Sequence, residues 1–246
     1  MATRVAQLVD VATTEPCVPL PTTAAQVRGE ILGQGQPWVS LSNLIDYCWS
    51  LGIPVIHLSS LLKAKRPDGL AVKVRGRPVV VLCKQDRSTA WLLFILAHEL
   101  GHIVLGHIPD DGVLLDENIK TNVVDVEEEA ANNFAIELLT GDQDCRFFPS
   151  GRWPNAAQLA QMAMDLGRPR QIDPGHIALE YAYTMGSDFW PVANAALSIL
   201  EPRRNALGII RRKMTEHLDW SSLPEDSSEF LMRVSKAEST SDLPVG

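Results

Sequence analysis

The sequence predicts an α+β fold with a mainly helical core, a small three-stranded sheet and a helical C-terminal region. Apolar residues recur every three or four positions over most of the chain, which is typical of helices that bury one face. Short runs rich in Val, Ile and Leu lie between residues 53 and 82, and such runs are typical of strands. With 246 residues and a hydrophobic content of 46%, the chain is large enough for one good-sized core, with or without a small satellite domain.

Composition and charge argue against several classes of protein. The net charge of −8 disfavours direct binding to nucleic acid. The four cysteines form no CxxC pair, which disfavours a cysteine zinc site and fits a reducing compartment. The N-terminus lacks the apolar segment of a signal peptide, and the longest apolar run, 90–97, is far shorter than the roughly 20 residues that cross a bilayer. We therefore expect a cytoplasmic protein with no membrane span and no direct contact with nucleic acid.

The first third of the chain combines helices with short strands. Residues 1–22, which end in a proline-rich stretch, are expected to form a flexible N-terminal arm. Periodicity then predicts two helices followed by three strands, over residues 23–33, 40–52, 53–58, 70–74 and 78–82. The last two strands are expected to form a hairpin. We expect the sheet to support the helix that follows it, and one sheet edge is a candidate for binding an extended peptide.

A long apolar segment over residues 90–105 contains the pattern HExxH, formed by His98, Glu99 and His102. The sequence predicts a buried helix here, capped at its start by residues 86–88. Residues four apart lie on one face of a helix, so the two imidazoles can bind one Zn²⁺ ion. Glu99 lies one step round the helix, where it can contact a metal-bound water without binding the metal. The alternative is that both histidines are core residues bonded to backbone carbonyls. The cost of burying two imidazoles and a carboxylate without compensation argues against it.

A second helix, predicted over residues 125–139, is a source for the third ligand. It follows a loop over about 108–124, and Glu127 and Glu128 flank its apolar face. Either carboxylate has the position needed to complete a metal site. The spacing of Asp125 and Glu128 also matches a capping box, and acids favour a helix N-terminus in any case. The residues by themselves leave this choice open.

The rest of the chain is predicted to be helical and then polar. The helical stretches cover about residues 155–166, 174–185, 189–200 and 203–217. The C-terminal segment is rich in Ser, Glu and Asp, so we expect it to be partly disordered or to form a partner-dependent flap. The expected organisation is an arm over 1–22, a metal-site domain over 23–145, a helical C-terminal region over 146–218 and an acidic, partly disordered tail over 219–246.

Two segments together resemble the ImmA/IrrE family of zinc metallo-endopeptidases. They are AHELGHIVLGH over residues 97–107 and EEAANNFAIELL over 128–139, within a resemblance that spans about 40–140. In that family the acid that opens the second motif is the third zinc ligand, so the resemblance implies Glu128 rather than Glu127. It also implies a zincin-like core of the gluzincin type. Asn132, one turn after Glu128, could bond a ligand histidine and fix its tautomer.

We therefore expect a zinc-dependent endopeptidase. His98, His102 and Glu128 would hold Zn²⁺, and Glu99 would take a proton from the zinc-bound water as it attacks the peptide bond. The candidates for stabilising the oxyanion are His107, His176, Tyr181, Tyr183 and His217. His57, in a predicted strand, is expected to be structural.

The resemblance also implies a regulatory protease with a specific protein substrate. Members of the family cleave a helix-turn-helix repressor and thereby release genes for stress response or mobile-element transfer. The expected partner is thus a DNA-binding repressor or an antitoxin-like protein. One alternative is a non-proteolytic zinc-containing binding module that regulates such a partner by docking. Glu99 argues against it, because a purely structural zinc ion needs no general base. The other alternative is a hydrolase that acts on a non-peptide substrate.

Overall fold

The computed structural model describes residues 2–59, 67–86, 88–109, 113–114, 122–148 and 153–236. Its helices are α1 (Ala2–Ala12), α2 (Ala24–Gly33), α3 (Leu41–Ser50), α4 (Thr89–Val104), α5 (Asn122–Thr140), α6 (Ala156–Arg170), α7 (Pro174–Met185), α8 (Trp190–Leu200), α9 (Ala206–His217) and α10 (Glu225–Ser235), with two short 3₁₀ helices, η1 (Ser187–Phe189) and η2 (Trp220–Ser222). The strands are β1 (Val55–His57), β2 (Gly69–Val74), β3 (Arg77–Leu82) and β4 (Val113–Leu114).

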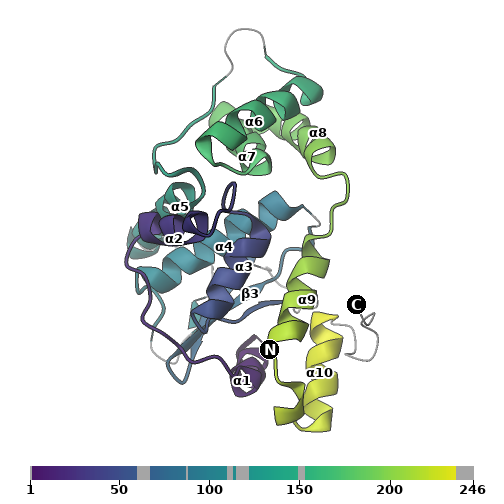
Figure 1. Cartoon of the computed structure of the whole chain (residues 1–246). Helices are drawn as coiled ribbons and strands as arrows, with labels where there is room; N and C mark the ends of the chain where they lie inside the picture. Colours follow the sequence, from purple (N-terminus) through teal and green to yellow (C-terminus); the bar gives the residue numbers. More distant parts are fainter. Residues whose placement is uncertain are drawn as a thin grey trace.

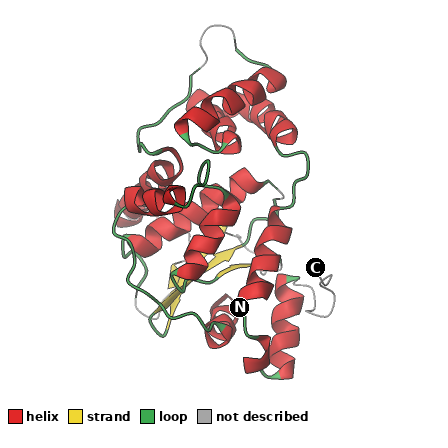
Figure 2. Cartoon of the chain, in the orientation of Figure 1, coloured by secondary structure: helices red, strands yellow, loops and turns green. Residues whose placement is uncertain are grey.

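This architecture confirms a mainly helical α+β fold. Figure 1 shows α6, α7 and α8 grouped at one end of the molecule, with α1, α9 and α10 towards the other. Helices α2, α3, α4 and α5 lie between these two groups. The strands, yellow in Figure 2, form a small sheet on which α3 and α4 pack, together with α1 and α9.

The sheet has the strand order β1-β3-β2-β4. β1 pairs with β3 in parallel, whereas β2 pairs antiparallel with both β3 and β4. The β2–β3 hairpin turns at Arg75 and Gly76, whose φ angles of 48° and 84° are the left-handed values that a tight hairpin turn requires. The three predicted strands are therefore present. β4 was not predicted, because two strand residues within a long loop carry no periodic pattern.

Helix α4 is the central helix of the fold. It packs on β2 and β3, on α3 and on α5, and it also contacts α7. Because neighbours cover it on several sides, α4 is apolar around most of its circumference, as expected for a buried helix. No described helix is both long and apolar enough to cross a membrane.

Buried apolar side chains form two clusters. The larger cluster contains strands β1 to β3, helices α1 to α3, most of α4, and helices α5, α9 and α10. The smaller cluster consists chiefly of residues from α6, α7 and α8, together with Ala90 from the first turn of α4. The predicted C-terminal region over 146–218 is divided between the two clusters, because α9 places Ile210 and Met214 in the larger one.

Both ends of the chain are more ordered than the sequence indicated. The expectation of a flexible arm over residues 1–22 is wrong for its first half, because α1 buries Val5 and Val9 completely. Residues 219–236, expected to be a partly disordered tail, form η2 and α10, and α10 packs on the larger cluster. Short amphipathic helices of this kind are stabilised by tertiary packing more than by local propensity. Residues 237–246 lie outside the described residues.

A buried arginine of α2 joins the C-terminal ends of two other helices. Arg28 is 9% exposed, and its guanidinium donates hydrogen bonds to the carbonyl oxygens of Leu138 and Leu139 in α5, at 3.1 and 3.0 Å. It also donates to the carbonyl oxygens of Arg170 and Gln171 at the end of α6, at 3.3 and 2.8 Å. The last carbonyls of a helix lack intrahelical donors and carry partial negative charge, so one guanidinium stabilises both ends. Arg28 thereby links the two clusters.

We predict that Arg28→Ala lowers the free energy of unfolding by about 3 kcal/mol, because it leaves several carbonyls at the two helix ends without a donor. Chemical denaturation measures this change. Arg168→Ala, which removes an exposed arginine near the same end of α6, should cost less than about 0.5 kcal/mol. Equal losses for the two variants would contradict the linking role of Arg28.

Candidate metal centre

Side chains of α4 and α5 bring three potential ligand groups together. His98 and His102 lie one turn apart on α4, and their Nε2 atoms are 3.0 Å apart. The Glu128 carboxylate of α5 lies 3.3 Å from each, with Oε2 facing His98 and Oε1 facing His102. One ligand atom of each residue lies within 4.8 Å of the others. Among the described residues Glu127 does not join this group, so the carboxylate at the site belongs to Glu128.

The second nitrogen of each imidazole has a partner that fixes the ring. The Nδ1–H of His98 donates to Oδ1 of Asn132 over 3.0 Å, which is the contact expected for Asn132. Nδ1 of His102 lies 3.0 Å from Nδ1 of His107, which follows the end of α4. When His102 donates in this pair, the Nε2 lone pairs of both imidazoles face Glu128. Histidines that bind a metal ion commonly have such outer hydrogen bonds, which fix the tautomer.

The three groups shift one another's protonation. Contacts with His102 and His98 hold the pKa of Glu128 well below its usual range. Burial alone would lower the pKa of His98, but Glu128 and the charge of Glu99 stabilise its protonated form and raise the pKa overall. The Glu128 carboxylate is therefore ionised, and the site attracts a cation.

The donor set fits a zinc ion. Two imidazole nitrogens and one carboxylate oxygen are common zinc ligands, and three protein ligands leave a position for water. His102 is 2% exposed, so its imidazole has lost nearly all contact with bulk water. A metal ion would compensate this loss for all three side chains at once.

Glu99 lines the same cleft as His98 and Glu128. The cleft has a volume of ≈ 230 Å³ and is also bordered by Asp68 and Gly69. Glu99 is 4% exposed, and a Cβ built on Gly69 would lie 2.7 Å from its Oε1. Gly69, at the start of β2, therefore makes room for the Glu99 carboxylate. This role of Gly69 was not predicted, although a glycine within a strand pattern often marks such a close approach.

The separation of α4 and α5 depends on another glycine. Gly101 faces α5, and a Cβ built there would lie 3.2 Å from the carbonyl oxygen of Ala131 and 3.2 Å from Cδ1 of Phe134. Ala131 is completely buried, so two small residues meet at this helix contact. Because Glu128 lies one turn before Ala131, the contact determines how closely its carboxylate approaches the two histidines.

The start of α4 is held from the smaller cluster. Ser88 is the N-cap, as predicted, and its side chain accepts a hydrogen bond from the backbone N–H of Trp91. Glu201, just after α8, accepts hydrogen bonds from the backbone N–H groups of Thr89 and Ala90, each at 3.0 Å. A carboxylate at a helix N-terminus also interacts favourably with the positive end of the helix dipole. Local sequence carries no signal for Glu201, because it lies far from α4 along the chain.

Two histidines outside the group have structural surroundings. His217, a candidate for oxyanion stabilisation, stacks on Trp49 with ring centroids 4.7 Å apart and pairs with Glu15 at 2.9 Å. It therefore joins α9 to α3 and to the N-terminal segment. His57 of β1 is completely buried and lies 3.2 Å from the carbonyl oxygen of Lys84, in keeping with the structural role expected for it.

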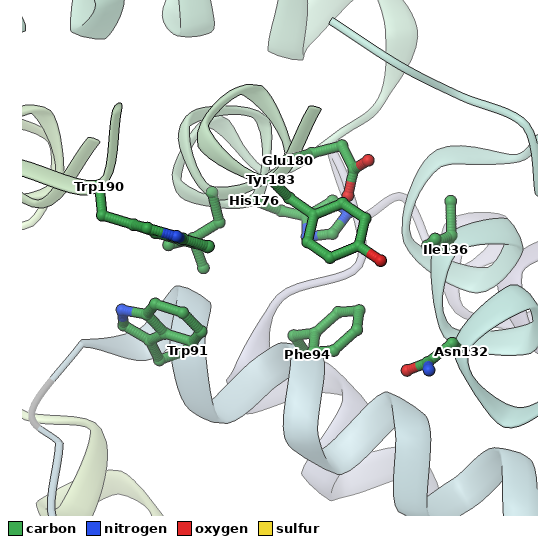
Figure 3. Close-up of a pocket in the computed structure, with 9 residues that line it drawn as sticks. Trp91, Phe94, Asn132, Ile136, His176, Glu180, Tyr183 and Trp190 are labelled. Atoms are coloured by element: carbon green, nitrogen blue, oxygen red, sulfur yellow. The ribbon is translucent and has the colours of Figure 1, made fainter. Parts of the chain in front are cut away.

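The other oxyanion candidates differ in their access to the cleft. His107 lies behind His102, on the side away from the ligand atoms. Tyr181 is completely buried. His176 and Tyr183 line a pocket beside the cleft (Figure 3). His176 is 1% exposed, and burial lowers its pKa to about 4, whereas Tyr183 is 66% exposed. Tyr183 is thus the member of this set that is open to solvent beside the metal centre.

Comparison with known proteins gives an independent view of this region. Residues 48–162 match the model of a peptidase family described as the IrrE N-terminal-like domain. The match contains the described strands and both helices of the candidate metal centre, and it ends within α6. These residues therefore match a domain of the ImmA/IrrE type, as the two sequence motifs implied. Neither the curated proteins nor the solved structures gave a match.

We predict opposite effects of the same substitution at two helical glycines. Gly29→Ala in α2 meets open space and should raise the free energy of unfolding by about 0.5–1 kcal/mol, because alanine favours a helix. Gly101→Ala should lower the free energy of unfolding. It should also weaken zinc binding about tenfold or more, because the added methyl group moves α5 and Glu128 away from α4. Denaturation and competition with a chromogenic chelator measure the two effects. Unchanged zinc affinity in Gly101→Ala would argue against helix spacing as the determinant of the site.

Proposed function

Because residues 48–162 belong to the IrrE N-terminal-like peptidase family, we propose that this chain is a zinc-dependent endopeptidase that cleaves a specific regulatory protein. The observation that supports the proposal most directly is the convergence of His98, His102 and Glu128. Glu99 lies in the wall of the cleft that His98 and Glu128 also line. A purely structural zinc site needs the ligands but not a further buried carboxylate beside them.

In this proposal His98, His102 and Glu128 hold the metal ion. A bound zinc ion polarises the scissile carbonyl and lowers the pKa of a water molecule towards neutrality. Asn132 and His107 keep the two imidazoles oriented through their Nδ1 atoms. Small errors in the direction of a ligand are costly, so these outer contacts are part of the proposed site.

Glu99 is the proposed general base. Its carboxylate accepts a proton from the water that attacks the carbonyl carbon, and then donates this proton to the leaving amine as the C–N bond breaks. Glu99 follows His98 directly in α4, so it lies at the cleft without entering the ligand group. Its low exposure, 4%, strengthens the electrostatic effect of the carboxylate on a nearby reaction centre.

The proposed substrate is a DNA-binding repressor or an antitoxin-like protein. β2 borders the cleft through Gly69, so the segment of the substrate that is cleaved would lie beside the start of this strand. The net charge of −8 favours association with a basic partner, such as a protein that binds DNA. An enzyme built for one exposed loop of such a partner would leave general substrates such as casein intact.

We predict that Glu99→Gln abolishes cleavage of the partner and retains zinc. Loss of a general base should lower kcat by about 10² to 10⁴-fold, whereas the ligand group is unchanged. Mass spectrometry of the candidate repressor after incubation measures cleavage, and elemental analysis of the purified protein measures zinc. If the Glu99→Gln variant supports the biological effect in full, the protein acts by docking rather than by proteolysis.

The two adjacent acids of α5 provide a second prediction. Glu128→Ala removes a ligand itself and should lower zinc affinity by more than about 100-fold. Removing a residue that only hydrogen-bonds a ligand costs up to about 100-fold. Glu127→Ala is the matched control and should retain zinc, because Glu127 does not contribute to the ligand group. Zinc content after dialysis against a weak chelator distinguishes the two variants. Loss of zinc in Glu127→Ala alone would move the third ligand to Glu127.

A further inference from the structure

A pocket lies beside the candidate metal centre, between the first half of α4 and helices α7 and α8 of the smaller cluster. Its volume is ≈ 140 Å³, and its walls are mostly aromatic and aliphatic. In Figure 3, Trp91 and Phe94 of α4 lie on one side of the pocket, and Trp190 and Tyr183 lie on the other. Leu179 of α7 completes the apolar wall.

The pocket is continuous with the cleft of the metal centre. Trp91, Phe94 and Asn132 line both spaces. Asn132 accepts the hydrogen bond from His98, and the ring centroid of Phe94 lies 6.5 Å from that of His98. A substrate residue beside the bond at the metal centre would therefore have its side chain within reach of the pocket.

The polar residues of the pocket present little charge to an occupant. Glu180 is 4% exposed, and its Oε1 lies 3.6 Å from Nη1 of Arg146. Burial also raises the pKa of Glu180 to about 7, which reduces its charge further. His176, with its pKa lowered by burial, is neutral at pH 7 and stacks on Phe94, with ring centroids 6.1 Å apart.

The aromatic walls favour an uncharged occupant. Trp91 and Trp190 stack on each other, with ring centroids 5.3 Å apart and an interplanar angle of 27°, so the paired indoles form one apolar wall of the pocket. The apolar lining favours an aromatic or aliphatic side chain, because binding buries its apolar area. The aromatic rings could also attract a cation, but Arg146 already pairs with the carboxylate behind the wall. A cationic side chain in the pocket would find Glu180 already paired and would be repelled by Arg146.

We infer that this pocket is a specificity subsite, which binds an uncharged aromatic or large aliphatic side chain next to the scissile bond. The inference rests on the proposed endopeptidase function. It assigns the selection of the substrate residue largely to α7 and α8, outside the helix pair that carries the ligand group. The match to the IrrE N-terminal-like domain ends at residue 162, before both helices begin. The preference therefore depends on the C-terminal region of this chain as well as on the walls that α4 and α5 supply.

Binding of capped amino acids tests the pocket without requiring catalysis. The full-length Glu99→Gln protein, loaded with zinc, is titrated with the N-acetyl amides of phenylalanine, leucine, alanine and arginine. NMR signals of the Trp91 and Trp190 indole N–H groups report binding. We expect the phenylalanine and leucine amides to bind at least about tenfold more tightly than the alanine and arginine amides, because only the first two fill an apolar pocket.

Tyr183 offers a matched pair of variants, because it is 66% exposed and its replacement leaves the buried clusters intact. Tyr183→Ala should weaken binding of the phenylalanine amide about fivefold or more, whereas Tyr183→Phe should retain it, because the ring supplies the contact. Trp153→Ala is the control: it removes another exposed aromatic side chain of this region, 67% exposed, that does not line the pocket. It should leave binding unchanged.

The outcomes separate this inference from the proposed function. Equal binding of all four amides, or tightest binding of the arginine amide, would overturn the subsite, as would unchanged phenylalanine binding in Tyr183→Ala. Cleavage of the partner protein by the wild-type chain is measured in parallel. Cleavage without discrimination among the amides would reject the subsite and leave the endopeptidase intact. Discrimination without cleavage would reject the endopeptidase and, with it, the assignment of the pocket to a scissile bond.

Discussion

The candidate metal centre depends on the close packing of α4 against α5. Gly101 and Ala131 allow this approach, since a Cβ on Gly101 would already lie 3.2 Å from the carbonyl oxygen of Ala131. At this separation Glu128 reaches both imidazoles that α4 presents one turn apart, at 3.3 Å each. An ionised carboxylate and two imidazoles held this closely are costly in a partly buried site unless a cation joins them. The packing of two small residues thus turns three ordinary polar side chains into one group suited to a metal ion.

The two clusters are joined by charged side chains that bind helix ends. Arg28 donates to the C-terminal carbonyls of α5 and α6, and Glu201 accepts from the first N–H groups of α4. Each charge has the sign that the local end of the helix dipole favours. Helices α4 and α5 carry the ligand group, so these two residues also fix that group relative to α6, α7 and α8. An apolar contact also joins the two clusters. Ala90 belongs to the smaller cluster, whereas most of α4 belongs to the larger one.

Local sequence was sufficient to predict the helix and histidines of the site. It was insufficient to predict the residues that hold the helices in position. The buried helix and its two histidines follow from apolar periodicity and from a spacing of four residues. The choice between Glu127 and Glu128 does not follow from periodicity, because both positions flank one helix face. That choice required the second motif and then the geometry of the helix pair. Arg28 and Glu201 act across long stretches of chain, for which a single sequence carries no signal. Helix α1 was missed for a related reason, since tertiary packing stabilises it more than local propensity does.

Helix α4 carries both the imidazoles of the ligand group and one wall of the neighbouring pocket. Its second half presents the imidazoles to α5, whereas Trp91 and Phe94, in its first half, form one wall of the neighbouring pocket. The pocket and the ligand group therefore lie at a fixed offset along one rigid helix of 1.5 Å rise per residue. The opposite wall belongs to α7 and α8, which contribute nothing to the ligand group among the described residues. Substitutions in those two helices can then change which side chain fits without disturbing the metal ligands, provided that Glu201 still holds the start of α4.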